Sequence, residues 1–181
     1  ARTTGALEEL DDEIKSAGGV ATLVPLDLKD YDGIDRLGAA LFERWGRLDV
    51  LFANAAILGV VTPLAHLDAK VWDEAMAINV TANWRLIRSL DPLLRASDAG
   101  RVLFMSSTAA RSCRPYWGTY SITKAALDAM AATYAAEVRQ GPVCVNVFYP
   151  GPIRTRMRAQ AMPGEDPETL SLPEVLVPDV I

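Results

Sequence analysis

Residues 101–124 read RVLFMSSTAARSCRPYWGTYSITK. The apolar run 102–105 predicts a strand, the small residues after Ser106 and Ser107 predict a loop, and regular structure resumes as a helix near Trp117. Side chains four positions apart on a helix share one face, with Cβ atoms about 5–6 Å apart. We therefore expect Tyr120 and Lys124 to point to the same place.

This pairing predicts an unusually acidic phenol. A free phenol has a pKa near 10, and a neighbouring cation lowers that pKa because it favours the charged form. Such a Tyr120 can exchange a proton with an alcohol or carbonyl oxygen, and a hydroxyl from Ser107 would hold that oxygen. Taken alone, however, a Tyr and a Lys one turn apart are more often a solvated helix face, and Ser pairs commonly end strands.

Further motifs change this balance. The sequence resembles the short-chain dehydrogenase/reductase family, whose signature places a Ser thirteen residues before a YxxxK motif. Counting back thirteen residues from Tyr120 reaches Ser107 and not Ser106. The other matches are ANAA at 53–56, where the family usually has NNAG, Asn79 within AINV, and PGPIRT at 150–155, which resembles the family's PGxxxT. The resemblance covers essentially the whole chain.

The resemblance implies an NAD(P)-dependent oxidoreductase that moves hydride between nicotinamide and a small-molecule carbonyl or secondary alcohol. Tyr120 would donate or accept the proton, and Lys124 would lower its pKa and hold the nicotinamide ribose. Ser107 would bind the reacting oxygen, and Asn79 would support a proton relay through a bound water. A mid-helix Asn that faces solvent or bonds to the backbone is the alternative for Asn79.

The same resemblance assigns cofactor contacts. In NAD-using relatives an acid near the end of the second strand bonds the ribose, whereas an Arg there pairs with the 2′-phosphate of NADP. Ala1 stands where the acid would be and Arg2 follows, which favours NADP(H) over NAD(H); an exposed surface Arg is the alternative. The implied cofactor-binding residues are Arg2, Asp27, Leu28, Asn54, Ala55, Ala56, Tyr120, Lys124, Pro150, Gly151, Ile153 and Thr155.

The rest of the chain alternates helical and strand patterns. Helical spacing predicts helices over 4–17 and 30–45, and a long helix from Asp68 to near Pro92. Apolar runs predict strands at 20–26, 48–53, 102–105 and 143–148. This alternation indicates an α/β fold, a Rossmann-like doubly wound parallel sheet with helices on both faces in three layers. The motifs above follow strand ends, where ligands bind in such sheets.

We interpret residues 1–181 as a single dinucleotide-binding domain in which 157–178 form a substrate-side flap; a surface helix with proline-rich edges is the alternative for that segment. The family's glycine-rich turn after the first strand is absent, so we expect the 181 residues to be an incomplete record of a longer chain. A short protein completed by a partner is the rival interpretation.

Composition narrows the partners. The net charge of −5 offers no basic surface for nucleic acid or membranes, and we expect a cytoplasmic protein. A single histidine, His66, and two cysteines without a CxxC spacing argue against a metal site, and we expect Cys113 and Cys144 to be buried. Alanines along the helix after Lys124 suggest a homodimer or homotetramer.

Two function classes besides an enzyme remain open from the sequence. One is a non-catalytic nucleotide-binding or regulatory protein on the same scaffold, which would bind cofactor without turnover. The other is an inactive fragment, which the missing glycine-rich turn keeps possible. The intact set of Ser107, Tyr120 and Lys124 favours the enzyme over both.

Overall fold

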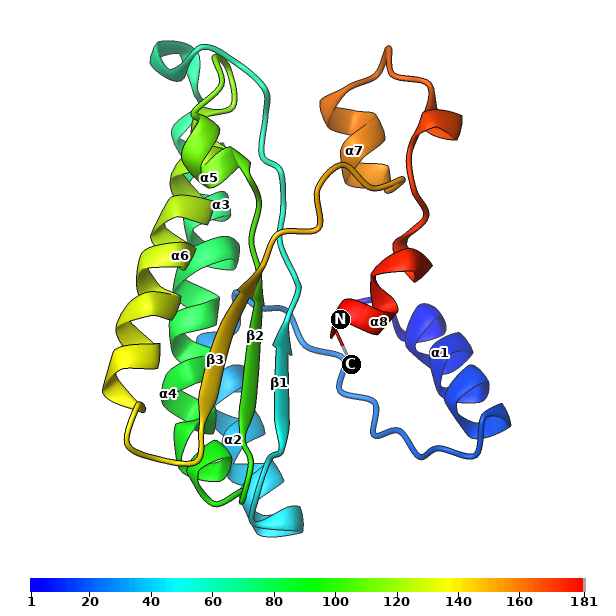
Figure 1. The fold of residues 1–181 in the computed structure, drawn as a ribbon, viewed down its shortest axis with the longest axis vertical. Helices are drawn as coiled ribbons and strands as arrows, with labels where there is room; N and C mark the ends of the chain where they lie inside the picture. The colour runs from blue at the N-terminus through cyan, green and yellow to red at the C-terminus, as the bar shows by residue number, and fades with distance from the viewer. Residues whose placement is uncertain (181) are drawn as a thin grey trace.

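The fold is built on a parallel sheet of strands β1 (Val50–Ala53), β2 (Arg101–Met105) and β3 (Cys144–Phe148), in that order. The structure is a computed structural model that describes residues 1–180, the side chain of Asp179 excepted. Leu51 lies opposite Val102, and Val102 lies opposite Val145. All three strands therefore end at the same edge, as Figure 1 shows, and the predicted α/β class is confirmed.

Helices lie on both sides of the sheet (Figure 1). One side carries α2 (Tyr31–Trp45), α3 (Ala69–Met76), a π-helical segment (Ala77–Thr81), α4 (Ala82–Arg95), α5 (Ala109–Ser112) and α6 (Gly118–Glu137). The other side carries α1 (Thr4–Ser16), α7 (Arg156–Ala161) and α8 (Val177–Val180). Short 3-10 turns occupy Leu64–His66, Pro167–Thr169 and Pro173–Leu176.

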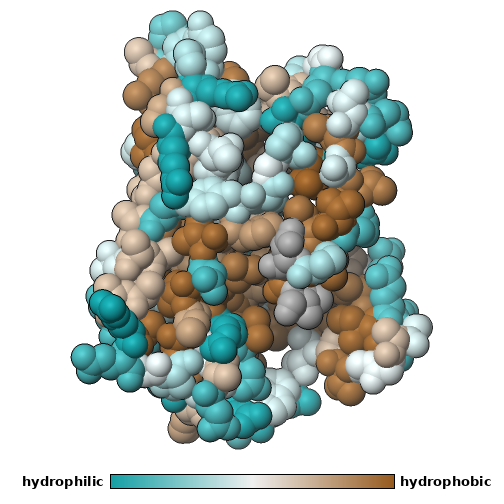
Figure 2. Space-filling model, viewed as in Figure 1, coloured by the Kyte–Doolittle hydropathy of each residue, from teal (hydrophilic) through white to brown (hydrophobic). Residues whose placement is uncertain are grey.

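The hydrophobic core fills the space between the sheet and helices α4 and α6. Phe104 and Leu94 are fully buried there, and Leu127 is nearly so. Burying a side chain of this size stabilises the fold by about 1.5–3 kcal/mol. Along β1 burial alternates: Leu51 and Ala53 face this core, whereas Val50 and Phe52 remain 58% and 45% exposed on the other face. Figure 2 shows apolar residues on the molecular surface between the two groups of helices.

Helix boundaries largely follow the sequence signals. The Asp30 carboxylate accepts a hydrogen bond from the Gly33 amide at the start of α2, and Gly46 ends that helix with a left-handed φ of 69°. Asp68 caps α3 through the Lys70 amide. The long helix predicted to end near Pro92 continues to Arg95. The proline lies in its last turn, where its missing N–H interrupts few of the helical hydrogen bonds.

The predicted strand over 20–26 is wrong. A strand needs a neighbour for its backbone ladder, and the described residues provide none beside this segment. The Leu26 amide donates a hydrogen bond to the Ala1 carbonyl at 2.8 Å, which does not amount to a ladder. The residues from Val20 onward therefore form an irregular connection between α1 and α2.

Two cysteines expected to be buried lie at the surface, and two tryptophans are also partly exposed. Cys144 is in register with Arg101 and Val50 on the open face of the sheet, and Cys113 is exposed in the left-handed turn that ends α5. Trp45 and Trp84 are about half exposed, and each ring lies against an arginine, with Arg44 and Arg85 at 4.5 and 5.2 Å from the respective ring centres. These aromatic faces are covered by cations and not by the core.

Among residues 1–180, none of the helices combines the length and the apolar character needed to cross a membrane.

Candidate active site

A cavity of about 620 Å³ lies at the carboxyl edge of the sheet, between the strand ends and the segment from α7 to α8. This size suits a small-molecule or cofactor site. Ten of the residues predicted to be functional line it: Asn54, Ala55, Ala56, Ser107, Tyr120, Lys124, Pro150, Gly151, Ile153 and Thr155. The parallel register brings them together, because each group follows the end of a different strand or begins the next helix.

Tyr120 lies in the first turn of α6 and is mostly buried. Trp117, just before that helix, packs edge-on against its ring with centroids 6.2 Å apart. Burial raises the pKa of Tyr120, and the nearby Ser107 hydroxyl only partly opposes the rise. The expectation of a lowered Tyr120 pKa is therefore wrong for the protein without ligand, since desolvation of the phenolate is the largest influence.

Lys124 explains why the phenol is not made more acidic. Its side chain is 2% exposed and its Nζ donates to the Met105 carbonyl at 2.6 Å. The ammonium thus lies against the Tyr120 ring, 5.6 Å from the ring centre. Burial lowers the pKa of Lys124 to about 8, while the Asp128 carboxylate acts in the opposite direction.

Asn79 lies in the π-helical segment and outside the cavity lining. It is 1% exposed, and its side-chain amide bonds both the N–H and the C=O of Ile57 at 2.8 Å each and the Thr123 hydroxyl at 3.0 Å. The extra residue of a π turn reorients side chains locally, often near functional sites. Asn79 thereby ties the loop after β1 to α6.

The predicted adenosine-side residues Arg2, Asp27 and Leu28 also lie outside the cavity lining. Arg2 is mostly exposed and forms an ion pair with Asp27 at 3.5 Å. The Lys29 amide donates to Asp27 at 2.9 Å and, as the leading cause, lowers the pKa of that carboxyl. Arg2 and Asp27 thus lie next to each other, but they do not line the cavity that holds most of the other predicted cofactor-binding residues.

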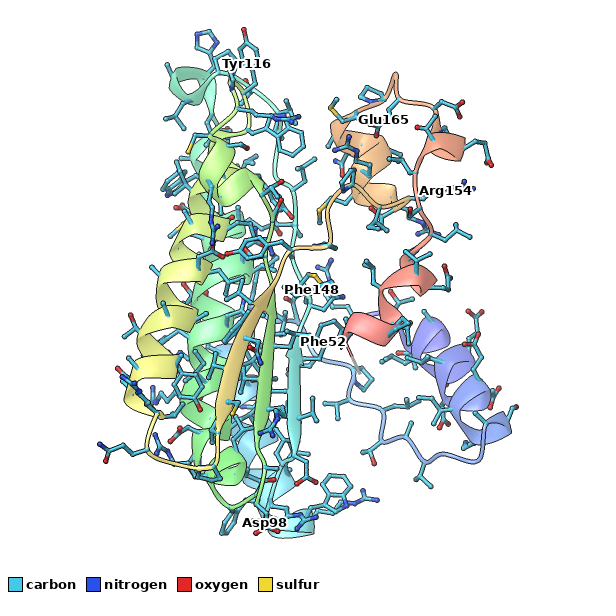
Figure 3. All side chains as sticks on the ribbon, in the orientation of Figure 1. Phe52, Asp98, Tyr116, Phe148, Arg154 and Glu165 are labelled. Atoms are coloured by element: carbon cyan, nitrogen blue, oxygen red, sulfur yellow. The ribbon has the colours of Figure 1, made fainter. Side chains whose placement is uncertain are left out.

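The segment after β3 covers the cavity and is held by hydrogen bonds between its own residues. Gly151 turns with a φ of 74°, a conformation that suits glycine. Beyond it, the Arg154 amide bonds the Ser171 carbonyl at 2.9 Å, and the Arg154 side chain bonds Glu168 twice. Arg158 makes a two-bond ion pair with Glu165. Figure 3 shows Arg154 and Glu165 on this segment, opposite the sheet.

Several cavity residues had no motif to mark them. Phe52, Leu58, Met105 and Ser106 line the cavity beside the predicted set, as do apolar residues of the closing segment: Met157, Ala161, Pro173, Leu176, Val177 and Val180. Phe52, labelled in Figure 3, follows from strand alternation once one face is known to be open. Trp117 also lines the cavity, whereas Cys113 and Arg114 line a separate depression of about 280 Å³.

The donor set fits the nicotinamide end of a dinucleotide. Two hydroxyls, from Ser107 and Tyr120, and the Lys124 ammonium meet in one cavity. The small side chains of Ala55 and Ala56 and the open left-handed turn at Gly151, where an added Cβ would meet nothing within 4 Å, leave room for a flat ring against backbone.

Comparisons with known proteins agree with this geometry. A family model described as short chain dehydrogenase matches residues 1–166. The uncharacterized oxidoreductase YciK of Escherichia coli K12 is 38% identical over 147 residues, which cover 81% of this chain and 58% of that protein. An uncharacterized NAD-dependent oxidoreductase of Mycobacterium tuberculosis is 31% identical over 156 residues, 86% of this chain and 56% of that protein. The chain therefore spans little more than half the length of these relatives.

Solved structures are also similar. A short chain dehydrogenase from Salmonella enterica serovar Typhi has a TM-score of 0.95 at 32% identity, with 99% of this chain and 75% of that chain covered. A protein from Escherichia coli CFT073 solved in complex with NADPH has a TM-score of 0.94 at 35% identity, with the same shares covered. These likenesses extend over the sheet, the helices and the closing segment alike.

Proposed function

The chain belongs to the short chain dehydrogenase family, and we propose that it is an NAD(P)-dependent oxidoreductase that interconverts a carbonyl compound and a secondary alcohol. The observation that carries the proposal is the convergence of Ser107, Tyr120 and Lys124 on one cavity at the carboxyl edge of a parallel sheet. This edge is where open α/β sheets bind ligands.

In this function Ser107 and Tyr120 act on the same oxygen atom, that of the substrate carbonyl. Ser107 donates a hydrogen bond to the carbonyl oxygen, and Tyr120 gives it a proton as the alcohol forms or takes the proton in the reverse direction. Lys124 holds the ribose hydroxyls. A bound nicotinamide supplies or accepts the hydride. Asn79 supports the geometry through Ile57 and Thr123.

The cofactor proposed is NADP(H) in preference to NAD(H). Arg2 is the cation next to the position where NAD-using enzymes carry an acid, and a relative of known structure was solved with NADPH. Another relative is described as NAD-dependent. Asp27 already pairs with Arg2, so a 2′-phosphate would have to share or replace that carboxylate.

The substrate proposed is an uncharged carbonyl compound with an apolar substituent. The cavity wall contributed by the closing segment includes Met157, Ala161 and Leu176. The cation in that wall, Arg158, is bound to Glu165 through its Nε and Nη2, and a carboxylate substrate would have to compete with Glu165 for it. We also propose that residues 157–178 act as the substrate-side flap of a single domain spanning 1–181.

The test compares Tyr120→Phe with Tyr116→Phe, an exposed tyrosine four residues earlier. The substrates are apolar ketones and aldehydes matched to carboxylate-bearing analogues, and NADPH and NADH are titrated by fluorescence against both variants. We expect Tyr120→Phe to lose about 10²–10⁴-fold in turnover while NADPH affinity is kept, and Tyr116→Phe to match the unchanged chain.

Retained turnover in Tyr120→Phe would contradict the assignment. Tighter binding of NADH than of NADPH would overturn the cofactor preference, and faster turnover of the carboxylates would overturn the substrate class. Cofactor binding without turnover across the whole panel would instead support a regulatory nucleotide-binding protein.

A further inference from the structure

Two side chains of α6 hold neighbouring residues at the end of β2. The Lys124 ammonium donates to the Met105 carbonyl at 2.6 Å, and the Ser106 hydroxyl donates to the Asp128 carboxylate at 2.5 Å. Lys124 and Asp128 are one helical turn apart and share a face. The same face of α6 therefore presents a cation and an anion to the strand end that carries Ser107.

The Asp128 carboxylate also reaches β3. The Tyr149 hydroxyl, directly after that strand, donates to its second oxygen at 2.8 Å, and Arg111 of α5 donates to the Tyr149 hydroxyl at 3.1 Å. Ser106 is 2% exposed. A carboxylate that accepts two hydroxyl hydrogen bonds is held in one orientation, so Asp128 ties α6 to the ends of two strands.

From this arrangement we infer that Asp128 is a positioning residue for Lys124. Its carboxylate, fixed by Ser106 and Tyr149, places an anion one helical turn from the buried ammonium and holds the strand end whose Met105 carbonyl receives that ammonium. The inference deepens the proposed function and rests on it for the kinetic part of its test. Ser106 lines the cavity, whereas Asp128 and Tyr149 lie outside its lining. None of the three belongs to the sequence motifs described above.

The physical need for such a carboxylate follows from burial. Desolvation lowers the pKa of Lys124 to about 8, and Asp128 is the group that opposes this decrease. The ionisable groups that the structure links to this cluster are Tyr120 on α6, Arg111 on α5 and Tyr149 after β3; Arg111 contacts Tyr149. Without the carboxylate, a larger share of Lys124 would be neutral near physiological pH.

The matched control is Asp91 on α4. Its carboxylate accepts a hydrogen bond from the Tyr134 hydroxyl at 2.8 Å and pairs with Arg95, so it repeats an Asp–Tyr contact, here between α4 and α6. It does not line the cavity. Asp91→Asn therefore removes a comparable charge and hydrogen bond without altering the surroundings of Lys124.

The experiment measures the pKa of Lys124 directly by ¹³C NMR titration of the lysine Cε resonances, with the Lys124 signal identified by its loss in Lys124→Met. It also records the pH profile of carbonyl reduction with NADPH. We expect Asp128→Asn to move both the Lys124 titration and the alkaline limb of reduction to lower pH by about one pH unit. Asp91→Asn should leave both in place, and Asp128→Glu should restore them.

Tyr149→Phe separates charge from clamping, because it keeps the carboxylate and removes one hydrogen bond. We expect its Lys124 titration to stay near that of the unchanged chain or to rise. If Asp128→Asn does not fold, the titration of Tyr149→Phe still tests the inference. An unchanged Lys124 titration in Asp128→Asn, or a titration lowered equally in Tyr149→Phe, would overturn the inference. A shifted titration in a protein without turnover would refute the proposed function and leave the role of Asp128 intact.

Discussion

At the scale of single residues, the adjacent serines Ser106 and Ser107 have different roles. Both serines line the cavity, but the Ser106 hydroxyl donates to Asp128, whereas Ser107 lies beside Tyr120. The Ser106 hydrogen is therefore already used, and Ser107 is the serine left to bind a substrate oxygen. The thirteen-residue spacing to Tyr120 and the geometry both select Ser107.

Alanine substitution of each serine gives a direct comparison. We expect Ser107→Ala to lower kcat by about 10²–10³-fold, because the reacting oxygen loses a donor, with little change in the free energy of unfolding. Ser106→Ala should instead lower the free energy of unfolding by about 1–2 kcal/mol, because a bond to a carboxylate is lost. Steady-state kinetics and urea unfolding measure the two effects, and equal kinetic losses in both variants would contradict the division of roles.

At the scale of elements, the π-helical segment between α3 and α4 joins parts of the site that do not adjoin in sequence. A regular α-helix through Asn79 would be consistent with the sequence, which shows one continuous apolar pattern there. The wider turn brings the Asn79 amide onto Ile57 and Thr123 instead. Asn79 thereby links the loop that follows β1 to α6.

Asn79→Ala tests the importance of that connection. The change leaves the N–H and C=O of Ile57 without their partner, so we expect the free energy of unfolding to fall by about 2–4 kcal/mol and turnover to fall with it. Asn83→Ala is the control, because Asn83 is also buried but makes one recorded side-chain bond, to the Asn79 carbonyl. Urea unfolding of both variants decides the point, and equal losses would speak against a special role for Asn79.

At the scale of the whole molecule, the two faces of the sheet differ. One is sealed by α4 and α6, whereas Val50 and Phe52 lie exposed on the other. On the outside of α6, Ala125, Ala129, Ala132 and Ala136 are exposed along the helix. Small side chains in a row permit another helix to approach closely, which supports the proposal of a homodimer or homotetramer.

An arginine in that row should prevent assembly. We expect Ala129→Arg to lower the molar mass measured by light scattering after size exclusion, because a long charged side chain would have to be buried between two helices. Ala6→Arg is the control, since Ala6 is exposed on α1, on the other side of the sheet. A chain that is monomeric before any substitution would refute the proposal.

The sequence determined those features that depend on neighbours along the chain. Helical spacing and capping residues predicted α1, α2 and α6 to within a few residues, and the strand ends marked by ANAA, Ser107 and PGPIRT all reached one cavity. These predictions succeeded because periodicity and capping are local, and parallel strands bring their carboxyl ends to a common edge.

Only the tertiary structure decided the rest. Residues 20–26 carry a strand pattern but have no ladder partner among residues 1–180, and Cys144 is exposed because it lies in register with Arg101 and Val50 on the open face of the sheet. The Tyr120 pKa is raised and not lowered because burial outweighs the effect of the Ser107 hydroxyl, while the Lys124 ammonium faces the ring and a backbone carbonyl. The roles of Asp128 and Tyr149 likewise arise from contacts between elements, since pairing, burial and electrostatic balance depend on residues far apart in sequence.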